Sequence, residues 1–399
     1  MRVAIVTESF LPSANGVTTS VLRVLDHLAA HGHHARVICP GPAPSAYAGA
    51  EVVEVGAVAY RGFPVGVPGA ALARALVEDP PDVLHAASPF VLGAQALAVA
   101  RRAGVPRVAV FQTDLAGYAR RHGHGLGLVA GPTWQWLKHV HGLADLNLAP
   151  SRAALADLRR HGVPRTQLWG RGVDTTAFHP RHRHTSAGRA LRRRLAPGGE
   201  LLVGYVGRLA PEKRVERLAV LAGRPGTRLV LVGEGPSKRA LEHRLGPLGV
   251  QLLGRLDGEE LATAYAVLDV FVHAGTEETF GQTLQEAMAS GVPVVAPASG
   301  GPLDTVDHGR TGLLFSPHDD ADLDRCVGRL LADRAQRLAM GEAGRRAALN
   351  RSWDAVCDEL LGHYDSVSAS SVLPGPGRRG RGGIRHIGGF PRVTSAPAH

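Results

Sequence analysis

Two glutamates, Glu278 and Glu286, have the spacing that first suggests chemistry, with seven residues between them. The stretch 273–297 predicts a strand, a loop, a helix that ends at Gly291, and a second buried strand. Glu278 then precedes the helix, and Glu286 lies about two turns inside it on roughly the same side. A helix N-terminus at the carboxyl end of a parallel strand favours anions. The two carboxylates are therefore candidates to accept hydrogen bonds from sugar hydroxyls at the two ends of a sugar diphosphate.

A second charged pair, Arg208 and Lys213, follows the predicted strand 201–206 and precedes a predicted helix over 215–222. Negative charge that develops on a departing pyrophosphate is stabilised by fixed cations near the leaving oxygens. We expect the two side chains to converge at this strand-to-helix loop. The alternative is a loop with two solvated basic residues.

Two further loops follow predicted strands of the first half. Gly16, next to Asn15, lets the backbone approach a phosphate or a sugar closely, and an ordinary turn is the alternative. Gln112 and Asp114 follow the predicted strand 107–111. Gln112 forms hydrogen bonds but does not titrate near neutral pH, which favours substrate positioning over acid–base catalysis. Asp114 is a candidate to bind the acceptor hydroxyl or the sugar, with capping of the loop as the alternative.

The run from Glu278 contains Phe280-Gly281 and then Glu286-Ala-Met-Ala-Ser-Gly-Val-Pro-Val-Val-Ala. This pattern resembles the signature of retaining nucleotide-sugar glycosyltransferases of family 4. The resemblance covers about residues 1–365. It implies an α/β protein with two Rossmann-like domains facing across a cleft, the GT-B fold, and catalysis that needs no metal ion or other cofactor.

The resemblance also implies a role for each candidate residue. Glu286 is expected to bind the nucleotide ribose and Glu278 to contact the transferred sugar. Arg208 and Lys213 are expected to bind the donor diphosphate, so that these two and Glu278 form the catalytic set. The remaining substrate-binding candidates are Gly16, Gln112, Asp114, Phe280 and Gly281.

The donor is suggested by several motifs together: Glu8-Ser-Phe-Leu-Pro, Gln112-Thr-Asp, Arg171-Gly-Val-Asp and Ser299-Gly-Gly-Pro-Leu-Asp. The combination is most similar to actinobacterial α-mannosyltransferases that use GDP-mannose and act on glycolipids. It implies GDP-mannose as donor and a lipid-linked or sugar acceptor. One alternative is a UDP-sugar-dependent glucosyl or glucuronosyl transferase, and a remoter one is a non-catalytic basic protein that binds nucleic acid or a membrane surface. The family often has His where Gln112 stands, so the effect of that residue is left open.

The elements that must position these residues alternate between short apolar runs and amphipathic segments, which predicts parallel, doubly wound sheets. Strands are expected at 2–7, 34–39, 51–55, 82–86, 107–111 and 145–148, and again at 201–206, 228–232, 251–253, 270–273, 292–296 and 312–315. The expected organisation is an N-terminal acceptor domain over 1–175, a linker over 176–199, a nucleotide-sugar domain over 200–352, a helix over 353–365 that returns to the first domain, and a disordered basic tail over 366–399.

The formal net charge of +10 includes five arginines in the predicted tail, which contains no acidic residue. The remaining excess is compatible with an anionic sugar nucleotide and with peripheral contact with an anionic membrane, and it does not favour a nucleic-acid partner. Three cysteines without paired or metal-type spacing favour a reducing compartment, and no apolar run is long enough to span a bilayer. We expect a cytoplasmic protein that contacts the inner face of the plasma membrane. Trp134 and Trp136 in the predicted helix 128–141 could face lipid, but a buried helix is favoured.

Overall fold

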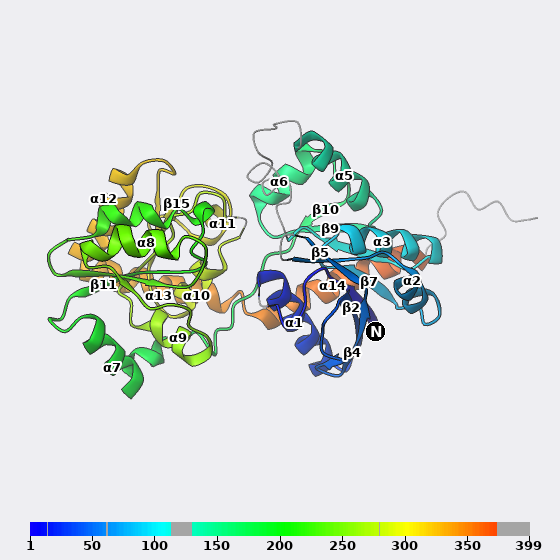
Figure 1. Cartoon of the computed structure of the whole chain (residues 1–399), viewed down its shortest axis with the longest axis horizontal. Coiled ribbons are helices and arrows are strands. Elements are labelled where there is room, and N and C mark those ends of the chain that lie inside the picture. Colours follow the sequence, from blue (N-terminus) through cyan, green and yellow to red (C-terminus); the bar gives the residue numbers. More distant parts are fainter. Residues whose placement is uncertain (14, 61–62, 113–129, 279, 373–399) are drawn as a thin grey trace, which may run out of the picture.

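The computed structural model describes residues 1–13, 15–60, 63–112, 130–278 and 280–372. This part of the chain forms two α/β domains that lie side by side (Figure 1). Each domain has a sheet with helices on both faces, so the predicted fold class of two Rossmann-like domains is confirmed.

The first sheet has the strand order β10-β9-β8-β7-β1-β2-β4-β3, and all its pairings are parallel except that of β3 with β4. The sequence predicted six of these eight strands and missed the two shortest, which have too few residues to show periodicity. The strands are β1 (Arg2–Val6), β2 (His34–Pro40), β3 (Ala46–Tyr47), β4 (Ala50–Val55), β7 (Val83–Ala86), β8 (Arg107–Val110), β9 (Leu146–Ala149) and β10 (Thr166–Leu168). A separate hairpin pairs β5 (Ala57–Tyr60) with β6 (Phe63–Gly66).

Alternate residues of β1 enter two different cores, as expected when successive side chains point to opposite faces of a sheet. Val3 and Ile5 pack with the apolar face of α1, whereas Ala4 and Val6 pack with α2 and α3. Apolar runs buried on both faces are typical of parallel strands. The helices of this domain are α1 (Gly16–Ala30), α2 (Ala70–Val77), α3 (Val91–Ala103), α5 (Ala130–Gly142) and α6 (Arg152–Arg160).

The second sheet is wholly parallel, with the order β13-β12-β11-β14-β15-β16. This is the strand order of a dinucleotide-binding Rossmann domain, in which ligands bind at the carboxyl ends of the strands beside the central reversal. Here the reversal lies between β11 and β14. The strands are β11 (Leu201–Val206), β12 (Thr227–Val232), β13 (Gln251–Leu252), β14 (Val270–Val272), β15 (Val294–Pro297) and β16 (Gly312–Phe315).

The helices of the second domain cover both faces of this sheet (Figure 1). The segment expected to be helical over 215–222 is a 3-10 helix, η4 (Val215–Leu221), preceded by the short turn η3 (Pro211–Lys213). The others are α8 (Lys238–Leu245), η5 (Gly246–Leu248), α9 (Gly258–Ala266), α10 (Gln282–Ala289), α11 (Pro302–Thr305), α12 (Asp320–Ala332) and α13 (Arg334–Leu349).

The segment 176–199, expected to be a linker, is ordered and belongs to the second domain. It contains η2 (Pro180–His184) and α7 (Ser186–Leu195), and Leu195 is buried in the core of that domain. Arg183 and Arg192 both form ion pairs with the buried Asp269, at 2.7 and 2.8 Å. Apolar burial and this charge cluster fix the segment to the domain that follows it.

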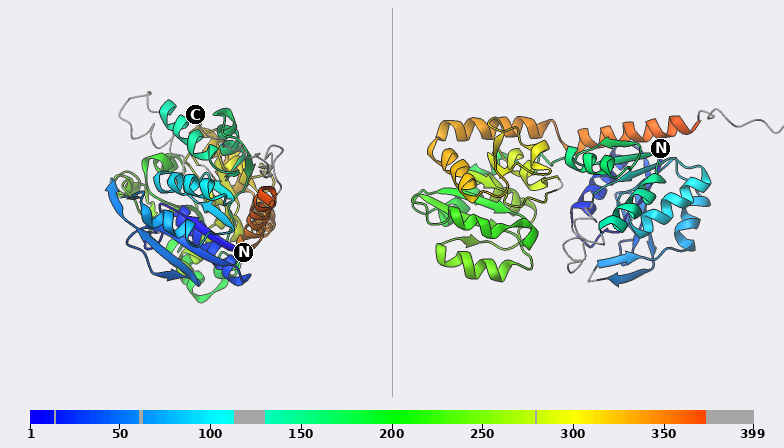
Figure 2. Two further views of the ribbon diagram at one scale, coloured as in Figure 1. Left: turned by 90° about the vertical axis from the view of Figure 1, so that its right-hand side faces the viewer. Right: turned by 90° about the horizontal axis from the view of Figure 1, so that it is seen from above.

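The last described helix, α14 (Trp353–Val372), packs on the first domain, while α13 lies on the second, so the two helices extend along one side of the molecule (Figure 2). Trp169 Nε1 donates to the Val356 carbonyl at 2.9 Å, and the Tyr364 hydroxyl lies 2.5 Å from His85 Nδ1. The prediction that this helix ends at 365 is wrong. Val367 is buried in the core of the first domain, so the helix extends beyond residue 366, where the tail was expected to begin.

Helix α5 packs one face in the first domain and exposes the other, so it is only half buried, whereas the sequence favoured a buried helix. Trp134, Leu137 and Val140 are at most 9% exposed, whereas the Trp136 side chain is 43% exposed. Trp134 also stacks on the ring of His161, with ring centroids 3.8 Å apart. Among the helices of the described ranges, none combines the length and the apolar character needed to cross a bilayer.

Candidate active site

Glu278 and Lys213 form the central ion pair of the second domain. Lys213 ends the turn η3 after β11 and Glu278 follows β14, and these strands are neighbours in the sheet. Their carboxyl ends therefore lie together at the reversal of the strand order. Lys213 Nζ donates to Glu278 Oε2 at 2.6 Å, and both side chains are largely buried. Burial alone would raise the pKa of Glu278, but the Lys213 charge, assisted by His273 and by hydrogen bonds, lowers that pKa to about 2.

The other carboxylate oxygen of Glu278 accepts hydrogen bonds from the two backbone amides that immediately precede α10. Phe280 N and Gly281 N donate to Glu278 Oε1 at 3.4 and 3.2 Å, and Gly281 has a φ of +92°, which favours glycine. The Phe280–Gly281 amides thus bind the protein's own carboxylate here. His273 Nε2 lies 3.7 Å from Glu278, and burial lowers the pKa of this imidazole to about 4.

Glu286 lies inside α10, with a different partner. Tyr265 Oη, from α9, donates to Glu286 Oε2 at 2.7 Å. Burial raises the pKa of Glu286 to about 7, although the hydrogen bond from Tyr265 opposes the rise. Near neutral pH this carboxyl group therefore populates both its protonated and its ionised form, and the ionised form accepts strong hydrogen bonds from hydroxyl groups.

Arg208 does not converge with Lys213 in this structure. Its side chain is 66% exposed, and its Nη1 lies 3.7 Å from Glu212, four residues along the chain. Lys213, at the end of the 3-10 turn in the same loop, pairs with Glu278 instead.

In the first domain, Gly16 and Gln112 lie around Arg171, which the sequence analysis named as the start of a motif but did not predict as a site residue. Arg171 Nη2 donates to Gln112 Oε1 at 3.0 Å, and a Cβ atom on residue 16 would lie 2.5 Å from Arg171 Nη1. Asn15 caps α1 by accepting from Val17 N and Thr18 N. The sequence feature that could have identified Arg171 is its position at the start of the Arg-Gly-Val-Asp motif, next to the predicted domain boundary. Asp114 lies outside the described residues.

Phe280 is a contact between the domains. It is 6% exposed, and a Cβ on Gly170 would lie 3.3 Å from its ring. Nearby, Arg152 N, the first amide of α6, donates to Asp304 Oδ2 at 2.5 Å across the interface. A cavity of about 270 Å³ lies between the domains at these residues. Phe280 and Asp304 thus help to hold the domains together in this arrangement.

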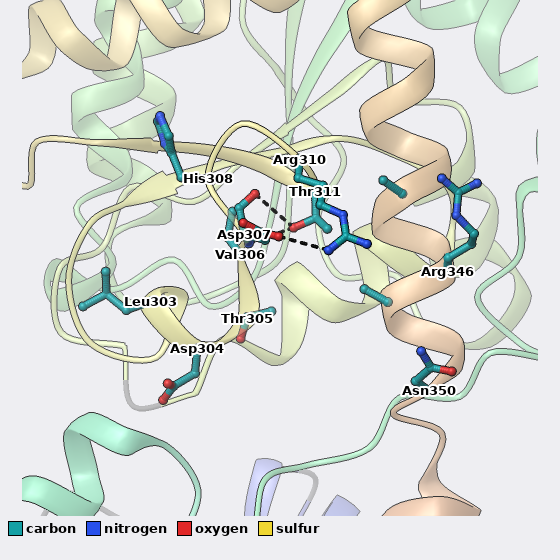
Figure 3. Close-up of a pocket in the computed structure, with 12 residues that line it drawn as sticks. Leu303, Asp304, Thr305, Val306, Asp307, His308, Arg310, Thr311, Arg346 and Asn350 are labelled. Carbon is teal, nitrogen blue, oxygen red and sulfur yellow. Dashed lines mark hydrogen bonds and ion pairs between the residues drawn. The ribbon is translucent and has the colours of Figure 1, made fainter.

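A larger pocket, of about 720 Å³, lies wholly in the second domain between α13 and the segment 303–311 (Figure 3). Arg310 Nη1 pairs with Asp307 Oδ2 at 3.4 Å on one side, and Arg346 projects from α13 on the other. None of the predicted site residues lines this pocket. It is therefore separate from the predicted donor site.

One group of potential metal ligands exists within the described ranges: His27, His31 and Asp358, from α1 and α14. His27 Nε2 lies 3.0 Å from Asp358 and His27 Nδ1 lies 3.7 Å from Asp354. None of these residues belongs to the predicted site.

Comparisons with known proteins identify the family of this chain. A family profile described as Glycosyltransferase Family 4 matches residues 14–177, and one described as Glycosyl transferases group 1 matches residues 189–347. The chain is 49% identical to a GDP-mannose-dependent alpha-mannosyltransferase of Mycolicibacterium smegmatis, over 92% of this chain and 98% of the relative. Proteins of the same name from Mycobacterium tuberculosis and Corynebacterium glutamicum are 48% and 44% identical, over 92% and 94% of this chain and 97% and 91% of theirs.

Solved structures show the same fold at low sequence identity. HepE from Anabaena in complex with UDP superposes with a TM-score of 0.76 at 19% identity, over 92% of this chain and all of the other. Sucrose-phosphate synthase from Thermosynechococcus elongatus gives a TM-score of 0.72 at 23% identity, over 92% and 99% of the two chains. With two Rossmann-like domains, the paired Glu278–Lys213 site and relatives that match along nearly the whole chain, this protein belongs to glycosyltransferase family 4 and has the GT-B fold.

Proposed function

We propose that this glycosyltransferase transfers an α-mannosyl residue from GDP-mannose to a glycolipid or related sugar acceptor, with retention of configuration. The observation that supports this donor most strongly is the similarity to three GDP-mannose-dependent relatives, at 44–49% identity over 91–98% of their lengths. The arrangement around α10 supports the reaction class.

In the proposed complex the nucleotide lies on the second domain. Ionised Glu286 accepts hydrogen bonds from the ribose hydroxyls. The ammonium group of Lys213 is shared between Glu278 and the donor diphosphate. The acceptor hydroxyl oxygen forms a bond to the sugar C1 as the C1–oxygen bond to the diphosphate breaks, and the acceptor proton goes to the departing diphosphate. Lys213 stabilises the charge that develops on the leaving group, with Arg208 approaching from the solvent side. Closure of the domains would exclude water from the reaction.

The proposal includes two further expectations. Transfer needs no metal ion, because the basic side chains supply the charge that a divalent cation supplies elsewhere. The basic chain makes peripheral contact with an anionic membrane surface at the cytoplasmic side, where a lipid-linked acceptor is presented, and nucleic acid is not a partner.

Thermal unfolding with GDP, UDP, ADP and GDP-mannose, first in EDTA and then with Mg²⁺, tests the donor. Selective stabilisation by GDP and GDP-mannose in EDTA supports the proposal. Stabilisation by UDP alone would retain the reaction class and overturn the donor. A response only with Mg²⁺ would overturn the metal-independent route, and no response to any nucleotide would favour a non-catalytic binder.

A further inference from the structure

Arg171 is placed where the two domains meet. It belongs to the segment that leaves the first domain, where Val173 forms a parallel bridge with Ser352 on the returning segment. Its side chain extends back to the first domain, to Gln112 at the end of β8, which lies 59 residues away in the sequence. The space that its guanidinium occupies exists because residue 16 is glycine.

The contact with Arg171 fixes the orientation of the Gln112 amide. A guanidinium only donates hydrogen bonds, so the atom of Gln112 that faces it is the carbonyl oxygen Oε1. The Nε2 group, with two N–H donors, therefore faces away from Arg171. Gln112 is only 9% exposed, and Nε2 has no hydrogen-bond partner among the residues that the structure describes.

A buried N–H donor without a hydrogen-bond partner destabilises the folded protein and needs an explanation. Gln112 lies at the carboxyl edge of the first sheet, the edge at which α/β domains bind ligands. Arg171 also lies in the electrostatic field of Glu278, which opposes the effect of burial on the guanidinium; the pKa of Arg171 is lowered to about 10, so the group stays charged. The unpaired N–H group of Gln112 is thus oriented by a permanently charged guanidinium, which lies where the two domains meet.

We propose that Arg171 is a positioning residue for the transfer reaction, which holds Gln112 Oε1 so that Gln112 Nε2 donates to an oxygen of the donor sugar. The inference rests on the proposed function, because it requires a nucleotide-sugar donor. Arg171 and Gln112 then act as one unit, in which the arginine supplies orientation and the glutamine supplies the contact.

The test uses full-length wild type and four variants: Arg171→Met, Gln112→Met, the double variant, and Gln112→Glu. Each single Met variant is expected to lower kcat roughly 10- to 100-fold and to leave GDP affinity within about twofold. The double variant should lose no more than either single variant, because both remove one unit. Losses that multiply in the double variant would overturn the proposal.

Gln112→Glu separates a positioning role from a structural one. The carboxylate keeps an acceptor for Arg171 and adds an ion pair, so thermal stability should stay equal or rise, while turnover falls because the N–H donor is lost. If turnover is also kept or raised in this variant, as thermal stability is, the contact has only a structural role. Arg23→Met is the matched control, because Arg23 pairs at 2.8 Å with Asp174 in the same connecting segment without touching Gln112; it should keep kcat within about threefold.

Binding distinguishes failure of this inference from failure of the proposed function. Wild type should bind GDP-mannose several-fold more tightly than GDP, and both Arg171→Met and Gln112→Glu should remove that preference. A preference that survives in the variants overturns the role of Arg171. A wild-type chain that binds no nucleotide sugar in the donor screen overturns the proposed function itself.

Discussion

Glu278 and Glu286 lie on one short stretch of chain, yet their partners give them opposite acid–base properties. Lys213 and two backbone amides keep Glu278 ionised far below neutral pH, whereas Glu286 has a single neutral donor, Tyr265, and titrates near pH 7. A carboxylate that is ionised at all working pH values suits a permanent charge next to the reacting sugar. One that is buried and easily protonated suits a site where the ligand itself, through its hydroxyls, stabilises the anion.

At the residue scale, Glu286→Gln should separate stability from donor binding. The folded-state pKa of Glu286 is raised to about 7 from the model-compound 4.5, so the folded protein binds this proton more tightly than the unfolded chain. The stability associated with that proton is present below pH 4.5 and is lost as the pH rises through about 7. The variant cannot ionise, so at pH 8 it should be more stable than wild type by roughly 1–3 kcal/mol, and at pH 4.5 nearly equal.

Urea unfolding at pH 4.5 and pH 8 checks this prediction. Glu342→Gln, at an exposed position of α13, is the control and should change stability by less than about 0.5 kcal/mol at both pH values. At pH 8 the Glu286→Gln variant should also bind GDP at least tenfold more weakly. An equal stability difference at the two pH values would contradict the assigned pKa.

At the element scale, the loops after β11 and β12 are joined backbone to backbone. Gly207 N donates to the Val232 carbonyl at 3.0 Å, and Leu209 N donates to the Glu234 carbonyl at 2.8 Å. Gly233 has a φ of +140°, and a Cβ on it would lie 1.9 Å from the Gly207 carbonyl oxygen. Close packing of these two loops sets the path of the chain from Gly207 to Lys213. Gly233 therefore has a structural role in placing Lys213.

Gly233→Ala should consequently destabilise the second domain and also lower activity. The Cβ meets backbone atoms, which cannot move aside without breaking the loop contact, so the expected loss is roughly 2–4 kcal/mol. Gly246→Ala, at a helical position with open space around the Cβ, is the matched control and should change stability by less than about 1 kcal/mol. Differential scanning calorimetry measures both, and equal unfolding temperatures for the two variants would contradict the argument.

At the scale of the whole molecule, the chain enters the second domain once and returns to complete the first. Trp353, Val356 and Tyr364 of α14 are part of the first core, and the Tyr364 hydroxyl lies against the buried His85. The two connecting segments meet where Val173 bridges Ser352. The first domain therefore cannot complete its core until the second domain has been synthesised, and the two connecting segments lie side by side between the domains.

Truncations test this dependence. Removal of 373–399 leaves every described contact of α14 in place and should preserve the unfolding temperature and the transfer activity. Removal of 353–399 takes away six buried side chains of the first core and should unfold that domain. Removal of 366–399 should give an intermediate loss, because it deletes buried Val367. Circular dichroism melting of the three truncated proteins measures the order of stability, and a wild-type melting curve for the shortest chain would contradict the prediction.

The sequence alone determined the fold class, most of the longer elements and the motif around α10, because the burial of strands and helices leaves periodic apolar patterns within a few residues. It missed the shortest strands and the end of α14. Tertiary structure decided which side chains meet. Lys213 and Glu278 are 65 residues apart, Arg171 and Gln112 are 59 apart, and Arg152 and Asp304 are 152 apart. Strand order and the packing of loops bring these residues together. Burial raises the pKa of Glu286, whereas the charge of Lys213 lowers the pKa of Glu278 against the effect of burial. For this reason the sequence pointed to both glutamates, but only the structure showed that the surroundings lower the pKa of Glu278 and raise that of Glu286, and that Arg171 contacts Gln112.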